Sequence, residues 1–220
     1  NLFAHFTDEG GRSIIGPFLS VLGASGTIVG FVGGFGEFMG YSIRSVSGYI
    51  ADKTGKYWAT TFAGYVINMF AVPALALAGS WPAAALLIVM ERTGRAIRRP
   101  AVETMLSYTT KELGRGWVFG LNEALDQVGA TAGPLLVALI LYLKGGYRSS
   151  FAILLVPALL CRGALTVARF LYPQPQKLEK EKPRTLQTKG FSGAYWTYLA
   201  AGTLIAAGFT GFSLISFHFQ

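Results

Sequence analysis

Long uncharged stretches separate short polar segments along most of this chain. No charged side chain occurs from Tyr57 to Met90 or from Gly190 to Gln220. An α-helix rises ~1.5 Å per residue, so about 20 residues cross a hydrocarbon layer of ~30 Å. The first stretch is too long for one crossing, and turn residues with a tryptophan interrupt it at 79–82. The pattern therefore predicts two crossings joined by a tight turn, an arrangement that the core of a soluble domain does not repeat.

The apolar stretches and their breaks predict an all-α membrane protein with seven crossings. The polar segment 173–190, which contains prolines and mixed charges, is interpreted as a linker between two bundles. Residues 1–172 then form a six-helix N-terminal bundle, and 191–220 hold a seventh helix that starts a second bundle. The expected crossings are 1–22, 27–51, 57–78, 82–108, 116–142, 147–172 and 191–215.

The composition agrees with this class of protein. Hydrophobic residues make up 52% of the chain and charged residues 14%, against about 25% charged in a typical soluble domain. The net charge of +8 would favour nucleic acid as the partner of a soluble protein. Cytoplasmic loops of membrane proteins also collect lysine and arginine, so no nucleic-acid partner is expected. The single cysteine, Cys161, excludes an intrachain disulfide and a CxxC metal site, and no metal or other cofactor is expected.

The cations in the loops set the expected orientation. Nine lysines and arginines between positions 53 and 189 fall in loops on one side, against Lys144 and Arg148 on the other. Because basic residues concentrate in cytoplasmic loops, the first side and the N-terminus are predicted to be cytoplasmic. The expected location is the cell membrane, with the chain crossing it several times.

The predicted fourth helix carries an unusual number of charges for a membrane span. With 100° between successive residues, its six charged side chains fit an arc of about 140°. A charge near mid-membrane costs ~2.5–3.5 kcal/mol on insertion scales, so this face is expected to line a cavity or a polar seam between helices. Pairing within the helix, between residues four apart, is the alternative explanation. The six residues are Glu91, Arg92, Arg95, Arg98, Arg99 and Glu103.

Other polar residues inside the predicted crossings are fewer. Asn122, Glu123 and Asp126 fall within about 100° of one another on the fifth helix. Arg162 lies near the middle of the sixth helix, where a carboxylate partner in the bundle is expected. His5 is interpreted as a structural residue in apolar surroundings.

The loop between the second and third crossings carries the most specific motif. The segment 48–57, GYIADKTGKY, resembles the signature loop G-x-x-x-D-R/K-x-G-R/K-R/K of the major facilitator superfamily, without its final base. Gly48 would let another helix approach closely, and Gly55 would permit the tight turn. Asp52 could face the positive N-terminus of a helix, while Lys53 and Lys56 would hold the loop at the cytoplasmic surface.

Two further stretches resemble members of this superfamily. Residues 92–100, RTGRAIRRP, resemble a fourth-helix segment R-x-G-K-G-I-R-x-P of a prokaryotic subgroup, with Ala96 in place of its second glycine. Gly120, Gly129, Gly133 and Pro134 match the opening of a fifth-helix signature of antiporters, whose trailing glycine pair is missing here. Ordinary helix packing and kinking also explain such small residues and the proline.

The resemblance covers essentially the whole chain and implies a secondary transporter of small molecules, not an enzyme. Such proteins have about twelve crossings in two halves with the substrate between them, so the rest of a longer chain is expected as a partner, beside the lipid bilayer. Proton coupling and efflux by antiport are expected. The alternative is a transporter-like sensor or scaffold that no longer transports.

The resemblance also implies roles for particular residues. Asp52 would stabilise one conformational state, with Arg98 or Arg99 as a nearby partner. A proton-driven carrier needs a carboxylate whose pKa changes between two states, and Asp8 and Asp126 match acidic positions of the subgroup. Glu37 is the next candidate, and a local ion pair of Asp8 with Arg12 is the structural alternative for Asp8. Glu91, Arg92, Arg95, Asn122 and Glu123 are expected to line the same cavity.

Overall fold

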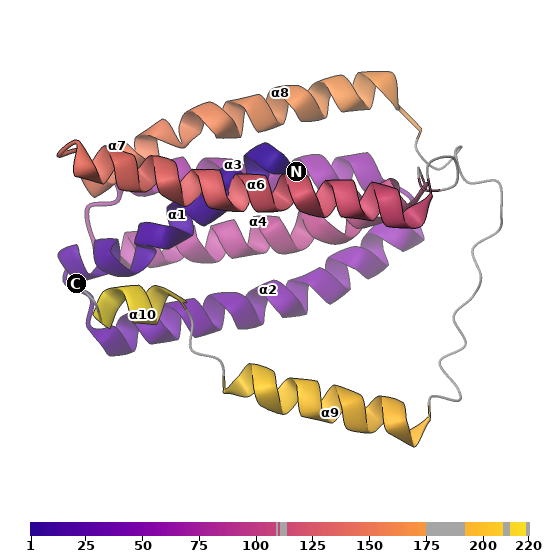
Figure 1. Ribbon diagram of the computed structural model, residues 1–220, viewed down its shortest axis with the longest axis horizontal. Coiled ribbons are helices and arrows are strands. Elements are labelled where there is room, and N and C mark those ends of the chain that lie inside the picture. The colour runs from indigo at the N-terminus through magenta and orange to yellow at the C-terminus, as the bar shows by residue number, and fades with distance from the viewer. Residues whose placement is uncertain (109, 111–113, 175–191, 209–211, 219–220) are drawn as a thin grey trace.

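The computed structural model describes residues 1–108, 110, 114–174, 192–208 and 212–218. All regular structure in this part of the chain is helical, as predicted (Figure 1). The elements are α1 (Leu2–Val21), α2 (Gly26–Thr54), α3 (Tyr57–Ala74) with the short 3₁₀ turn η1 (Leu75–Leu77), α4 (Trp81–Tyr108), α6 (Arg115–Tyr142), α7 (Tyr147–Ile153), α8 (Leu155–Leu171), α9 (Gly193–Ala207) and α10 (Phe212–His218).

The predicted crossings agree with these helices to within a few residues over the first 172 positions, with one break. The predicted sixth crossing is divided into α7 and α8, which meet at Leu154. Pro157 has no backbone N–H to donate to the Ile153 carbonyl, which accounts for the interruption. The predicted single helix over 191–215 is instead two helices, α9 and α10. Gly208 follows α9, and glycine is a poor helix former. Most of the predicted linker lies outside the described residues.

Close contacts between glycine and backbone join the helices in pairs. Gly64 on α3 and Gly94 on α4 face each other, so that a Cβ added to Gly64 would lie 2.6 Å from the Gly94 carbonyl oxygen. On α6, a Cβ at Gly129 or Gly133 would collide with the backbone of α1 at Leu2 or Phe6. These helices approach closely because glycine has no side chain, as in many membrane bundles.

The apolar core occupies the end of the bundle where α1 runs into α2 and α6 into α7. Phe18 on α1 packs edge-on against Phe151 on α7, with ring centroids 5.0 Å apart. Val72, Leu75 and Leu154 belong to the same buried cluster. The polar side chains described below lie farther along α1, α3 and α4, so an apolar end and a charged middle follow one another along the bundle axis.

The outer surface suits a bilayer. In the part of the chain that the structure describes, three helical stretches are long and apolar enough to cross a membrane, namely Tyr57–Leu77, Gly116–Tyr142 and Tyr147–Leu171. The helices α1, α2 and α4, which contribute most of the charged side chains of the bundle interior, are not among them. Figure 1 shows α10 beside α1 and α2 and shows α9 apart from the other helices.

Candidate functional site

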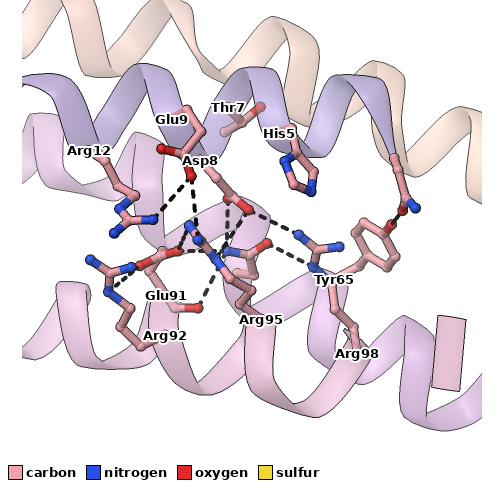
Figure 2. Close-up of polar contacts among 12 residues, drawn as sticks. His5, Thr7, Asp8, Glu9, Arg12, Tyr65, Glu91, Arg92, Arg95 and Arg98 are labelled. Carbon is pink, nitrogen blue, oxygen red and sulfur yellow. Dashed lines mark hydrogen bonds and ion pairs between the residues drawn. The ribbon is translucent and has the colours of Figure 1, made fainter. Parts of the chain in front are cut away.

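A buried polar cluster joins α1, α3 and α4 near the middle of the bundle (Figure 2). Its centre is Asn68, which is fully buried and donates to the Asp8 Oδ1 atom over 3.0 Å. Arg98 donates to the other oxygen of Asp8 over 3.0 Å and to the Asn68 side-chain oxygen over 3.2 Å. The Arg98 guanidinium also lies over the ring of Tyr65, 4.4 Å from its centroid. Asp8 and Arg98 are 2% and 4% exposed, so the pair is shielded from solvent.

Glu91 and Arg95 extend this cluster along α4. The Arg95 guanidinium donates to Glu91 Oε1 over 2.5 Å, and its Nε lies 3.4 Å from Asp8 Oδ2. Asn68 donates to the same Glu91 oxygen over 3.4 Å. The close approach of α3 to α4 requires glycine at position 94, because a Cβ there would lie 2.5 Å from the Asn68 backbone nitrogen. The small residue thus lets the Asn68 side chain reach acids on two helices.

A more exposed part of the network links α1 and α2 to α4. The Glu37 side chain is 44% exposed, and its Oε1 atom accepts from Arg92 over 2.9 Å and from Arg12 over 3.3 Å. Arg12 also pairs with Glu9 over 3.2 Å. The local pair of Asp8 with Arg12, the structural alternative for Asp8, is not formed, because Asp8 points to Arg95 and Arg98. Towards the other end of α4, Glu103 accepts from Arg44 and Arg99, each over 3.0 Å.

Two cavities border the arginine face of α4. One, of about 250 Å³, lies between α1, α2 and α4 and is lined by charged side chains that include Glu37, Arg92 and Arg95. The other, of about 350 Å³, lies between α1, α4 and α6 and is lined by residues that include Arg98 and Asp126. Both explanations of the charged face apply, since Glu91 and Arg95 pair within the helix and the same face borders cavities and polar seams.

Asp126 lies on α6 beside α1, at the second cavity. Its Oδ2 atom accepts from Asn122 over 3.1 Å and lies 3.5 Å from Nε2 of His5. Its other oxygen, Oδ1, is buried without a hydrogen-bond partner among the described residues. Asn1 continues the chain of polar groups by donating to Asn122 over 2.6 Å. The cavity therefore holds a carboxylate with one free oxygen, next to an imidazole that the sequence alone marked as structural.

The remaining candidate residues of α6 and α8 form no side-chain hydrogen bond or ion pair with Asp126 or the buried cluster around Asn68. Glu123 lines the second cavity and accepts from Gln127 over 2.7 Å. Gly129 and Gly133 lie against α1, with Pro134 next to them inside α6. Arg162 is exposed on α8, and the expected carboxylate partner is not found among the described residues.

The signature loop lies at the end of the bundle away from the apolar core. Gly55 ends α2 in the left-handed conformation, with φ of 65°, that glycine adopts at little cost. Asp52 accepts from the hydroxyl of Tyr57 over 3.2 Å, and Lys53 lies over the ring of Tyr49. Gly48 faces Pro100 of α4, since a Cβ added to Gly48 would lie 3.4 Å from the Pro100 Cβ. Lys56 precedes the first residue of α3.

Asp52 was expected to lie near Arg98 or Arg99, but it lies near neither arginine in this structure. Tyr57, the partner of Asp52, packs edge-on against Tyr108 at the end of α4. Arg98 lies ten residues before that end, or about 15 Å along the helix. It is turned towards Asp8, and Arg99 pairs with Glu103. Arg98 belongs to the buried network and Arg99 to the more exposed ion pairs of Glu103, so neither arginine belongs to the loop.

Sequence reasoning missed three members of this network. Asn68 stands in an uncharged apolar stretch, where a single amide gives no periodic signal. Arg12 on α1 was considered only as a local partner of Asp8, and Glu9 was given no partner, although Arg12 reaches α2 and Glu9 reaches α4. A polar residue in the middle of an apolar span is itself a functional signal, and Asn68 could have been found that way.

Comparisons with known proteins agree with this architecture. The sequence model of the Major Facilitator Superfamily matches residues 2–220. Uncharacterized proteins of Mycobacterium tuberculosis and Mycobacterium bovis are each 38% identical over 223 residues, which cover 99% of this chain and 54% of each relative.

An uncharacterized MFS-type transporter of Methanocaldococcus jannaschii is 31% identical over 193 residues, which cover 85% of this chain and 45% of the relative. The chain thus spans about half the length of the relatives it matches. The helical bundle, the three apolar spans and the match over nearly the whole chain lead to one assignment. This multi-pass membrane chain belongs to the major facilitator superfamily.

Proposed function

We propose that the full-length protein is a secondary active transporter of small molecules that works by alternating access. The observation that carries this proposal is the set of buried charges on α4 that border two cavities. Each such charge costs ~2.5–3.5 kcal/mol at the centre of a bilayer, a cost that a purely structural bundle has no need to bear. The second wall of the solute path would come from a further bundle, because transporters of this kind bind solute between two halves.

We propose protons as the coupling ion and efflux as the direction. Asp126, at the cavity between α1, α4 and α6, would carry the proton, because its free oxygen offers a site for one. Asp8 would hold the helices together, because two arginines and an amide already occupy its oxygens. Exchange of labelled solute by vesicles that contain the full-length protein tests the carrier function. The solutes to test are those that shift the melting temperature of the protein. If none of them were exchanged faster than in protein-free vesicles, the carrier function would be contradicted.

The signature loop gives a prediction about rate. Asp52 would stabilise one state of the carrier from the cytoplasmic end, since its position in the last turn of α2 would let it face a helix N-terminus of the second bundle. Asp52→Asn should leave the amount of protein in the membrane unchanged and slow solute exchange at least tenfold, a factor that about 1.4 kcal/mol between two states produces. Wild-type exchange rates in this variant would refute the role in switching.

The proposed orientation is tested by labelling. With Cys161 replaced by Ser, single cysteines at Lys53 and at Lys144 should react with an impermeant thiol reagent from opposite sides of the cell membrane. Lys53 lies at the end of α2 and Lys144 between α6 and α7, at opposite ends of the bundle. Lys144→Cys should be labelled in intact cells, and Lys53→Cys only after the membrane is opened. Labelling of both from outside would exclude the orientation.

A further inference from the structure

The cavity between α1, α2 and α4 is strongly basic. Its volume is about 250 Å³, and among the described residues Glu37 is the only acidic side chain that lines it. The hydroxyl of Tyr41 and the small residues Gly40 and Ala96 complete the wall among the described residues. The arginines that line it are Arg12, Arg44, Arg92, Arg95 and Arg99. A cavity with this lining is far more favourable for an anion than for a cation.

Pairing inside the protein does not neutralise these arginines completely. The arginine ion pairs of the described residues form two separate groups. One joins four arginines to four carboxylates. The other joins Arg44 and Arg99 to Glu103 alone, which leaves one positive charge beside the cavity. Glu103 serves two guanidinium groups at once and does not line this cavity. Each guanidinium carries five N–H donors in a planar fork, so several donors remain for a further oxyanion.

Glu37 shows where an oxyanion would be held. Its Oε1 atom is bound by Arg92 from α4 over 2.9 Å and by Arg12 from α1 over 3.3 Å. The side chain is 44% exposed, whereas Arg92 is 5% exposed and fixed beside Glu91. The arginine is therefore the held member of the pair and the carboxylate the movable one. An anionic oxygen from outside could take the same two donors if Glu37 turned away.

We propose that this cavity binds the carboxylate or phosphate group of a small organic anion and that Glu37 occupies the place of that group when the cavity is empty of solute. That the bound anion is the solute carried by the protein rests on the proposed function. Pockets for drug-sized ligands measure about 300–1,000 Å³, so this volume suits a small anion or the anionic end of a larger molecule. Binding would release Glu37 from Arg12 and Arg92, which links occupancy to the contact between α1, α2 and α4.

The site is tested by melting the purified full-length protein with inorganic phosphate, with citrate and with the cation tetraphenylphosphonium, at one ionic strength set with potassium chloride. A ligand that binds the folded state raises the melting temperature with its concentration and so gives a Kd. At least one of the two anions should raise the melting temperature, and tetraphenylphosphonium should not. Glu37→Gln should lower the Kd of that anion about tenfold, because the competing carboxylate is lost.

The controls separate a local effect from a loss of folding. Arg12→Gln should weaken anion binding about tenfold, and the 31% exposure of its side chain favours a folded variant. Thr131→Val, on α6 and outside this cavity, removes a hydroxyl that bonds only to the Gln127 carbonyl and should leave the Kd unchanged. No shift with either anion, or equal Kd values for wild type and Glu37→Gln, would overturn the inference. If the protein exchanged a cation and bound neither anion, the inference would be overturned and the proposed function would stand. If the anion bound as these variants predict but no solute were exchanged, the site would be supported and the transport function contradicted.

Discussion

Asp8→Asn should lower the free energy of unfolding of the full-length protein by about 3–5 kcal/mol, the loss expected when one member of a buried ion pair is removed. Asp8 is 2% exposed and accepts from Asn68 and Arg98, with Arg95 also within 3.4 Å. An amide in its place leaves the buried Arg98 guanidinium without its carboxylate. Unfolding in detergent, followed by intrinsic fluorescence, measures the difference.

Two comparisons make this prediction specific. Glu103→Gln breaks ion pairs whose side chains are 35–50% exposed, and each such pair contributes about 0–1 kcal/mol. The double variant Asp8→Leu with Arg98→Met should recover part of the stability lost by Asp8→Leu alone, because it leaves no buried charge unpaired. Equal losses for Asp8→Asn and Glu103→Gln would show that the interior network does not hold the helices together.

The sequence was sufficient to predict the helices but not their partners. The apolar stretches and their breaks located the helices of residues 1–172 to within a few positions, because a membrane span needs a fixed length of uncharged chain. Spacing along one helix also predicted the pairs that Glu91 forms with Arg95 and Arg99 with Glu103. Periodicity marks the polar face of a helix, but it does not state which helix covers that face.

Long-range partners depend on helix packing that the sequence does not reveal directly. Arg98 was expected near Asp52 but is directed to Asp8, ninety positions away, because Gly64 and Gly94 bring α3 and α4 into contact. Asn68 at that contact decides which acids the arginines meet. A glycine on each of two neighbouring crossings could have indicated the close approach, but the register of the two helices follows only from the fold.

The largest expected effect on transport comes from Asp126→Asn. Asp126 is 8% exposed, and its Oδ2 atom contacts Asn122 and His5. The charged groups that line its cavity include Arg95, Arg98 and Glu123, but no ion pair joins Asp126 to an arginine among the described residues. In the proposed mechanism this carboxylate would take up a proton at its free oxygen in one state and release it in the other, which asparagine cannot do. We therefore expect coupling to be lost while solute binding is retained.

Thr131→Val is the matched control on the same helix, since the Thr131 hydroxyl donates to the Gln127 carbonyl and not to the cavity. It should behave as wild type. A loss of coupling in both variants would point to a general disturbance of α6 and not to the carboxylate.

Vesicles that contain the full-length protein, loaded with solute and placed under a pH gradient, allow uphill accumulation and downhill exchange to be measured in one preparation. Wild-type protein should concentrate solute against its gradient until a protonophore is added. Asp126→Asn should abolish that accumulation and keep exchange at the wild-type rate. An Asp126→Asn variant that still concentrates solute to the wild-type level would contradict proton coupling through the cavity between α1, α4 and α6.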